Sequence, residues 1–338
     1  MIKEIRIATR QSRLALWQTE YVADTLRRAH PGIEIEIIPM TTRGDEILDK
    51  SLAKVGGKGL FIKELETAML EGRADIAVHS MKDVPWDLPR GMKIGAVLQR
   101  ADAGDAIVAR KKEASLASLP EGARIGTSSL RRQAQIRHSR PDLRVEPVRG
   151  NVETRLRKLD KGDFDAIILA SAGLKRLGLG ERITGRLTMD ECLPAVGQGV
   201  IGIECRSEDQ EIGEALKHIE HARTRRCIDA ERSLARELQA SCESPIAAYG
   251  EYRDGELFVR GVVATPDGSR ILKASVRGSA TDGSAARSHS PSEVSSKIRT
   301  ASVSQPKGRS NSVAGISFIT STSTSNPAVS SPGRSIGR

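Results

Sequence analysis

The sequence predicts an α/β protein of two related lobes joined by a hinge, with a small α+β domain and a Ser-rich segment after them. Apolar strand patterns alternate with helical patterns over residues 1–205, the order typical of strand–helix–strand units. The same order of elements occurs twice in this part of the chain. After residue 209, a long helical pattern precedes three strand patterns, which is typical of an α+β domain.

The length and charge of the chain limit the functions that it can have. A chain of 338 residues is long enough for two or three domains. Seven basic residues and one acidic residue fall in residues 283–338, which leaves only +4 of the formal charge of +10 for the rest. Residues 1–282 are therefore not basic enough to predict a nucleic-acid partner. The first residues form no apolar signal segment and no run reaches membrane-spanning length, so we expect a cytoplasmic protein without a membrane partner.

Four cysteines stand at positions whose spacing matches no CxxC pattern: Cys192, Cys205, Cys227 and Cys242. This spacing predicts no zinc site, and we expect no metal ion. We expect reduced thiols, because nothing in the sequence indicates secretion. Three of them are predicted to be small buried side chains. Cys242 lies in a predicted loop, Ala-Ser-Cys-Glu-Ser-Pro.

The first lobe begins with a predicted strand, Ile5–Thr9, and a helix for which Ser12 is a suitable N-cap. Four residues at helical spacing predict the buried face of this helix: Leu14, Trp17, Tyr21 and Leu26. The elements expected next are a strand at residues 33–37, a Gly-rich mobile loop at 49–59, a helix at 60–70 and a strand at 75–80.

The stretch Ala74–Pro85 is the centre of the first lobe. Its buried strand ends just before Lys82 and Asp83, and Pro85 prevents the strand from simply continuing. In open α/β sheets, ligands bind at the carboxyl ends of the strands. Lys82 and Asp83 are therefore either part of a binding site or a surface pair in a loop.

The second lobe repeats the plan of the first. Three segments of the first lobe have loose counterparts: Arg6–Thr9 in Arg124–Thr127, His30–Ile35 in Arg140–Val145, and Glu71–Ile76 in Lys161–Ala166. We expect the chain to cross to the second lobe at residues 99–105 and to return at 193–199, so that two crossings form a hinge. The predicted domains are domain 1 (1–99 and 197–219), domain 2 (100–196) and domain 3 (220–282).

The last part of the chain changes character twice. We expect a helix from about Asp209 to Leu238, then strands at residues 250–252, 257–264 and 271–276. Residues 283–338 are dominated by serine and show neither helical nor strand periodicity. We predict that this tail is disordered, because it has too little apolar content to pack.

Basic and hydroxyl side chains gather where the predicted strands end. They are Arg10 and Ser12, Lys82 with Asp83, Thr127, Ser128, Ser129, Arg131 and Arg132, and Arg149, Asn151 and Arg155. Each arginine alone is most often a solvated surface charge. Several at one edge, with a helix that opens within Thr127–Arg132, predict a site for carboxylate or phosphate groups.

Five segments, in order, resemble the porphobilinogen deaminase family, also called the hydroxymethylbilane synthases: Ala8–Ala15, His79–Pro85, Gly126–Arg132, Arg149–Val152 and Leu193–Gly199. The stretch from Glu231 to Pro245 resembles the cofactor-attachment motif of that family. The similarity runs from residue 5 to about residue 278. It implies two lobes like those of periplasmic binding proteins, and a third domain that carries the cofactor cysteine.

The resemblance also implies an activity. The family's enzymes are transferases that condense four porphobilinogen molecules head to tail, with loss of ammonia. The product is the linear tetrapyrrole hydroxymethylbilane of porphyrin and haem biosynthesis. A dipyrromethane cofactor would be attached to Cys242 through a thioether. We further expect a monomer that hands its product to the next enzyme of the pathway.

The same resemblance implies roles for individual residues. Asp83 and Lys82 would be catalytic, because a carboxylate can stabilise the cation left when ammonia departs. Carboxylates of the growing chain would pair with guanidinium groups. The cofactor would be bound by Cys242, Lys82, Asp83, Thr127, Ser128, Ser129, Arg131, Arg132 and Gly173. The substrate would be bound by Arg10, Ser12, Arg149, Arg155, Arg176 and Gln198.

Two departures from the family pattern bear on activity. Ala240 and Ser241 stand where the family often has two glycines. After residue 282 the family continues with a helix, whereas here a serine-rich run follows, as a changed reading frame would produce. Without that helix, an apolar face of the third-domain sheet would be left uncovered. The protein would then be a less stable and less active deaminase. The alternative function is a non-catalytic two-lobe protein that binds a small anion and needs neither Asp83 nor Cys242.

Overall fold

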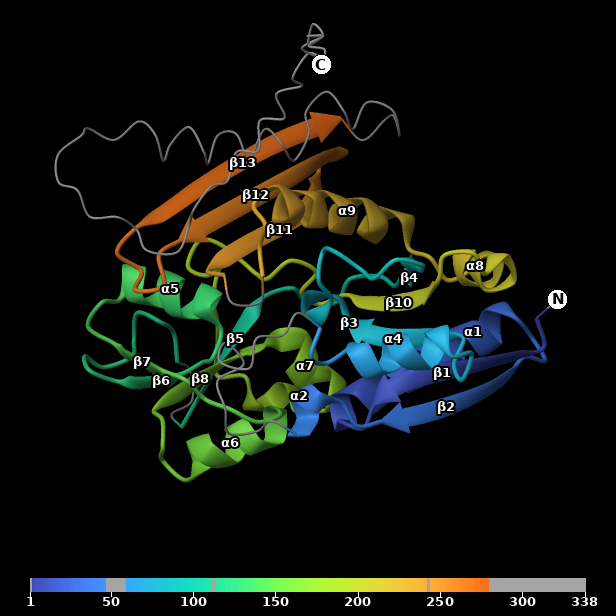
Figure 1. Cartoon of the computed structure of the whole chain (residues 1–338). Helices are drawn as coiled ribbons and strands as arrows, with labels where there is room; N and C mark the ends of the chain where they lie inside the picture. Colours follow the sequence, from blue (N-terminus) through green and yellow to red (C-terminus); the bar gives the residue numbers. More distant parts are fainter. Residues whose placement is uncertain (1, 47–58, 111–113, 242–243, 280–338) are drawn as a thin grey trace, which may run out of the picture. The chain divides into compact units, whose positions relative to one another are not determined.

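The computed structural model describes residues 2–46, 59–110, 114–241 and 244–279 (Figure 1). Most of the predicted Gly-rich loop, the side chain of Cys242 and the predicted disordered tail lie outside these residues. None of the helices in the described ranges is long and apolar enough to span a lipid bilayer. The described elements form three sheets, each with its own helices.

The first sheet has the order β2-β1-β3-β10-β4. Its strands are β1 (Glu4–Arg10), β2 (Glu34–Met40), β3 (Ile76–Ser80), β4 (Met92–Val97) and β10 (Ile201–Arg206). Its helices are α1 (Arg13–Ala29), α2 (Arg43–Glu46), α4 (Lys63–Leu70) and α8 (Gln210–Lys217). Because side chains alternate along a strand, Ile7 packs with α1 residues on one face, while Ala8 packs with Leu65 of α4 on the other. Strands β2, β1 and β3 are parallel, and β10 is antiparallel to β3 and β4.

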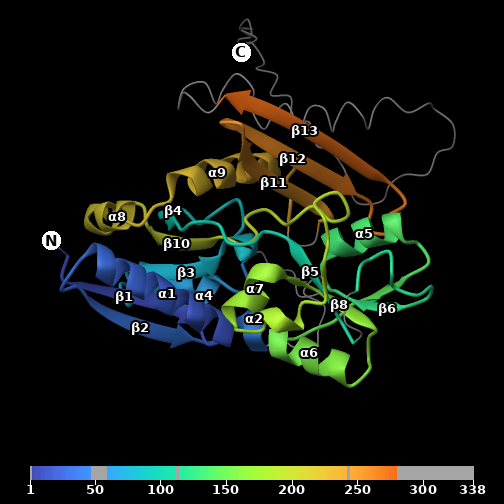
Figure 2. The same cartoon turned by 180° about the vertical axis from the view of Figure 1, so that it is seen from behind.

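The second sheet has the corresponding order β7-β6-β8-β5-β9. Its strands are β5 (Asp105–Ala109), β6 (Arg124–Gly126), β7 (Arg144–Glu146), β8 (Ala166–Ala170) and β9 (Gly185–Arg186). Its helices are α5 (Leu130–Ser139), α6 (Val152–Asp160), α7 (Ser171–Arg176) and the 3-10 turn η2 (Gly180–Arg182), of which α5, α6 and α7 are visible in Figure 2. Strands β7, β6 and β8 are parallel and β5 is antiparallel to β8, so both sheets have the same build.

The repeat predicted from the sequence holds for individual hydrogen bonds. Asp75 accepts from the Arg6 backbone N–H at 2.9 Å, and its own N–H donates to the Arg6 carbonyl at 2.9 Å. In the second lobe, Asp165 accepts from the Arg124 N–H at 2.8 Å and donates to the Arg124 carbonyl at 2.9 Å. In both lobes, the same residue pair therefore links the first strand to the strand that follows the crossover. The predicted α/β fold class with two related lobes is confirmed.

The third sheet is antiparallel, in the order β11-β12-β13. Its strands are β11 (Ile246–Arg253), β12 (Glu256–Ala264) and β13 (Ile271–Ser279), and α9 (Ala222–Glu237) lies along it (Figure 1). Leu234 of α9 is fully buried in a cluster with Val259 and Val276 of the sheet. This helix therefore covers one face of the third sheet. The domain boundaries at residues 99, 196 and 219 remain predictions.

Two details of the helices differ from prediction. The prediction of one helix from Asp209 to Leu238 is wrong, because the chain forms two helices, α8 and α9, with a break between them. At the break, the His221 N–H donates to the Val97 carbonyl of β4, and its side chain accepts from the Thr224 N–H as the N-cap of α9. A tertiary contact and a local cap together interrupt a pattern that looks continuous in the sequence.

The predicted buried face of α1 is also partly wrong. Leu26 is buried, but Trp17 is 37% exposed and Tyr21 is 45% exposed. The residues that α1 does bury are Ala15, Gln18, Thr19, Val22, Ala23 and Leu26. The sheet therefore contacts a face rotated from the one with the largest apolar side chains. Ser12 does cap this helix as predicted, accepting from the Ala15 N–H at 3.3 Å.

Three titratable side chains lie buried between α4 and the first sheet. His79 Nε2 is 2.8 Å from a carboxylate oxygen of Glu204, and both side chains are almost fully buried. Glu66 is 7% exposed, and one of its oxygens has no partner in the described residues. Burial, with the negative charge of Glu204, raises the pKa of the Glu66 carboxyl to about 7, although His79 and Lys63 oppose this.

We predict that Glu66→Gln weakens the pH dependence of stability. The folded protein keeps the Glu66 proton that the unfolded chain releases near its ordinary pKa of 4.5. The contribution of Glu66 to the free energy of unfolding is therefore fully present below that pH. On the order of 3 kcal/mol of it is lost as the pH rises towards 7. Urea unfolding at pH 5 and pH 8 should show a smaller difference for the variant than for the wild type. Glu20→Gln, an exposed position on α1, is the control, and equal pH dependence in wild type and Glu66→Gln would contradict the prediction.

Candidate active site

A short 3-10 turn, η1 (Met81–Asp83), carries Lys82 and Asp83 at the carboxyl end of β3. Two glycines leave room for it, Gly197 in the return crossing and Gly202 in the following strand β10. A Cβ on Gly197, where φ is +72°, would lie 2.8 Å from Met81 Cβ and 3.2 Å from the Lys82 nitrogen. A Cβ on Gly202 would lie 2.1 Å from the Met81 sulfur. The turn is therefore held directly against the segment that returns from the second lobe.

Beside this turn, a buried carboxylate neutralises two of the predicted binding arginines. Asp105 is fully buried and lies 2.8 Å from Arg131 Nη2 and 2.7 Å from Arg132 Nη2. Gln198 donates to the same carboxylate at 2.8 Å. Burial alone would raise the pKa of Asp105, but the two guanidinium groups hold it well below its ordinary value. The structure thus places Arg131, Arg132 and Gln198 in one network around an acid that sequence reasoning did not single out.

The charges of Lys82 and Asp83 act on those of the second lobe. Burial lowers the pKa of the Lys82 ammonium; Asp83 opposes this and Arg132 adds to it. Burial, with the positive charges of Arg132 and Arg149, lowers the pKa of the Arg155 guanidinium to about 10, against the opposing effect of Asp83. Side chains from both lobes therefore form one electrostatic cluster that is rich in cations.

The predicted hydroxyl groups lie at the start of α5 and make local contacts. A helix opens within Thr127–Arg132, as predicted; the structure shows that Ser129 is its N-cap and accepts from the Arg132 N–H at 3.5 Å. The Ser128 hydroxyl donates to the Val148 carbonyl at 2.7 Å. Thr127 is fully buried, and its hydroxyl accepts from the Ser129 N–H at 3.3 Å. These hydroxyls shape the loop before α5, and that of Ser128 remains half-buried.

Arg176 lines a small cavity of about 20 Å³ between α1, β3 and α7. Lys82 and Gly173 line it as well, as do Gln18 and Ser80. Gln18 Nε2 donates to the Ser80 hydroxyl at 2.8 Å. Gln18 and Ser80 were missed by sequence reasoning, although the position of Ser80 directly before η1 was a usable signal.

Arg10 makes its own ion pair away from Asp105. Its guanidinium pairs with Asp45 and lies 4.2 Å from the ring centroid of Phe61. The Asp45 carboxylate is also held by the Thr42 hydroxyl at 2.7 Å. The charge of Arg10 is thus neutralised by an acid of the same lobe, whereas Arg155 has no carboxylate partner in the described residues.

The three cysteines predicted to be buried are buried and free. Burial raises the pKa of Cys192 to about 12 and that of Cys205 and Cys227 to about 11. Such thiols are almost fully protonated at neutral pH and are poor nucleophiles. Cys242 lies outside the described residues, between Ser241 and Ser244.

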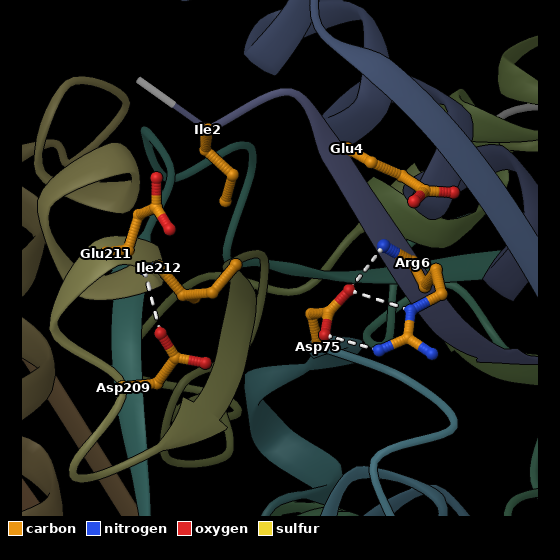
Figure 3. A pocket seen from close by; sticks show the side chains of 7 residues that line it. All are labelled: Ile2, Glu4, Arg6, Asp75, Asp209, Glu211 and Ile212. Carbon is orange, nitrogen blue, oxygen red and sulfur yellow. Dashed lines mark hydrogen bonds and ion pairs between the residues drawn. The ribbon is translucent and has the colours of Figure 1, made fainter.

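A larger pocket of about 340 Å³ lies at the opposite, amino end of β1 (Figure 3). It is lined by Ile2, Glu4, Arg6, Asp75, Asp209, Glu211 and Ile212. Figure 3 shows the Arg6 guanidinium turned towards the carboxylate of Asp75, which it contacts at 2.8 Å. With four acids and one arginine that is already paired, this pocket would repel an anionic ligand.

The fold and the cation cluster define a class: a two-lobed α/β protein that has a lysine and an aspartate at a strand end, beside guanidinium groups suited to carboxylates. Comparison with known families makes the class specific. Residues 5–214 match the family model "Porphobilinogen deaminase, dipyromethane cofactor binding domain", and residues 225–289 match "Porphobilinogen deaminase, C-terminal domain". The chain belongs to the porphobilinogen deaminase family.

Curated relatives agree over most of their length. The chain is 54% identical over 278 residues to a porphobilinogen deaminase of Xanthomonas axonopodis pv. citri, covering 82% of this chain and 91% of the relative. It is 54% identical over 268 residues to that of Paraburkholderia phytofirmans, covering 79% and 78%. The protein is thus a hydroxymethylbilane synthase that binds porphobilinogen and uses a dipyrromethane cofactor. The alternative of a non-catalytic binding protein is not supported.

Solved structures of other proteins show more distant likenesses. The Bordetella pertussis BvgS VFT2 domain matches with a TM-score of 0.40 at 18% identity, over 64% of this chain and 86% of the other. The methionine-binding protein MetQ matches with a TM-score of 0.41 at 13% identity, over 64% and 88%.

We predict that Gly197→Ala displaces η1 and lowers turnover by at least about tenfold, because a methyl group there meets the Met81 backbone. The measurement is kcat together with Tm. Gly72→Ala is a matched control, since Gly72 has a similar φ of +70° but nothing within 4 Å of an added Cβ. Equal kcat in the two variants would show that the close approach of Gly197 does not position the turn.

Proposed function

We propose that Asp83 is the catalytic carboxylate of the condensation and that Lys82 is its partner in the site. The observation that supports this proposal is that η1 carries both residues at the carboxyl end of β3, where Arg132 of the second lobe lowers the pKa of Lys82 and Asp83 opposes the lowering of the pKa of Arg155. Asp83 has no ion-pair partner in the described residues, so its charge is available to a cationic reaction centre. Arg149, Arg155 and Arg176 bind substrate carboxylates in this proposal.

The residues present fit a dipyrromethane group. Arg155 and Arg176 are half-buried, and burial lowers the pKa of each guanidinium to about 10. Neither pairs with a carboxylate within the described parts of the chain. Buried cations of this kind are stabilised when an anionic group binds, and a carboxylate-bearing pyrrole pair supplies one. When bound, the cofactor supplies a free pyrrole carbon to which the first substrate unit is joined.

We assign the following roles to the protein's own residues in the condensation. Porphobilinogen carries an acetate, a propionate and a protonated aminomethyl group. Its C–N bond breaks, ammonia leaves, and a cationic azafulvene remains, whose charge and pyrrole N–H the Asp83 carboxylate stabilises. Asp83 would then accept the ring proton that is lost when the unit is joined. The guanidinium groups hold the carboxylates while this happens.

The roles of Arg131 and Arg132 are narrower in this proposal than the sequence suggested. Both already share the Asp105 carboxylate, so only the remaining N–H groups of each fork are available to a ligand. We propose that they shape and charge the site, together with Gln198. Thr127, Ser128, Ser129, Gly173, Arg10 and Ser12 complete the proposed cofactor and substrate contacts.

We further propose that the enzyme acts as a monomer in the cytoplasm and passes its product to the next enzyme of the pathway. The three described cysteines are free thiols, which suits a reducing compartment. Sedimentation at several protein concentrations tests the oligomeric state.

We predict that Cys242→Ala abolishes the covalent dipyrrole adduct. The reason is chemical: the other three thiols are buried and protonated, so none can replace the lost nucleophile. Mass spectrometry of the intact purified protein measures the adduct. Cys205→Ala should keep it. An adduct on Cys242→Ala would place the attachment on another residue.

We predict that Asp83→Asn keeps the adduct and the fold but lowers turnover by on the order of 10²–10³. The amide has the same shape but cannot stabilise a developing cation. Rates of porphobilinogen consumption and adduct mass, measured on the same preparation, separate catalysis from cofactor loading. Asp87→Asn, an exposed acid four residues further along, is the control. Near-normal turnover of Asp83→Asn would reject Asp83 as the catalytic carboxylate.

A further inference from the structure

An exposed aromatic pair on α1 lies outside the buried face of that helix. The rings of Trp17 and Tyr21 stack with a centroid distance of 5.4 Å and an angle of 6° between their planes. They are 37% and 45% exposed, and the chain has only nine aromatic residues of the Phe, Trp and Tyr types. Large aromatic side chains that remain in water, in a chain so poor in them, point to binding rather than to packing.

The pair continues from the cavity beside η1. Leu14 and Gln18 of α1 line that cavity, and Trp17 and Tyr21 follow Leu14 and Gln18 by one helical turn. Helix α1 contacts α7 of the second lobe here, where a Cβ on Gly173 would lie 3.6 Å from Leu14. The stacked rings therefore extend the site outward along the same side of α1.

The guanidinium of Arg176 lies between the cavity beside η1 and the stacked rings. Arg176 lines the cavity, and its guanidinium carbon lies 5.8 Å from the Trp17 ring centroid. The guanidinium donates to the Gly199 carbonyl at 2.8 Å, and no carboxylate of the described residues pairs with it. The surface thus offers ring faces for stacking and a positive charge for an acid group, side by side.

We propose that Trp17 and Tyr21 form a stacking platform for the outer pyrrole rings of the growing chain, with Arg176 holding a carboxylate of the same rings. This proposal rests on the function proposed above and names the ligand of one part of that site. The occupant follows from its chemistry, since each added unit is an aromatic ring that carries two carboxylates. Stacking on aromatic side chains is typically worth about fivefold to a hundredfold in binding. A chain that lengthens while its inner end stays attached must place its outer rings beyond the cavity, which is where the platform lies.

The test is the double variant Trp17→Ala/Tyr21→Ala of the complete, cofactor-loaded protein. One equivalent of porphobilinogen, followed by native mass spectrometry, measures the first addition, and an excess measures the later ones. We expect the first addition to change by less than twofold. We expect tetrapyrrole formation to slow at least fivefold, with enzyme carrying one or two added units accumulating.

Two further variants and a spectroscopic readout complete the test. Trp17→Phe/Tyr21→Phe keeps the rings and should keep most of the rate, and Leu70→Ala removes another exposed apolar side chain, on α4, and should have no effect. Fluorescence should fall as units are added to the wild type but not to Trp17→Phe, where only Trp86 remains.

The outcomes separate the platform from the proposed function. If Asp83→Asn takes up porphobilinogen as fast as the wild type, the proposed function of the site fails. If wild type elongates and the double Ala variant elongates equally fast, only the platform fails. Two other outcomes would also overturn the platform. If the double Ala variant already loses the first addition, the rings serve the inner site. If the wild type is a dimer and the double Ala variant is a monomer, the rings bind a second copy of the chain.

Discussion

A carboxylate buried away from water must be matched by cations or N–H groups, and the segments that join the three sheets depend on this constraint. Glu231 of α9 is fully buried and lies 2.7 Å from Arg100 Nη1, while its other oxygen accepts from the Gly197 N–H at 2.7 Å. The Gly250 N–H of β11 donates at 2.7 Å to Glu231 Oε1, the oxygen that faces Arg100 Nη1. One side chain thus ties the outward crossing, the return crossing and the third sheet together. Removal of one partner of such a pair typically costs about 3–5 kcal/mol, because the other charge stays buried.

The same constraint divides the arginines into two groups. Arg100, Arg131 and Arg132 face buried acids, and their charge is neutralised within the protein. Arg155 and Arg176 are half-buried and have no acid partner among the described residues, so their positive charge remains available to a ligand. Attraction for an anionic substrate therefore comes mainly from the second group. The first group fixes the geometry in which the second group is presented.

Local features of the fold were predictable because their causes are local. The strand expected at residues 75–80 forms as β3 (Ile76–Ser80), and Ser12 caps its helix as expected. These features depend on residues within about one turn of each other. The face of α1 was not predictable, because Trp17 has the apolarity of a core residue and only the position of the first sheet shows that it stays in water. The break between α8 and α9 likewise needs the contact of His221 with β4.

The sequence by itself determined the family, the order of the elements and the residues at the strand ends, including Lys82 and Asp83. These follow from motifs and periodicities that are written in neighbouring positions. Only the tertiary structure decided which charges neutralise one another. Arg132 and Asp105 are 27 residues apart, and Arg100 and Glu231 are 131 apart, and no periodicity links such positions. The pairing of charges depends on distances of a few ångströms between distant segments, and the sequence does not contain those distances until the chain has folded.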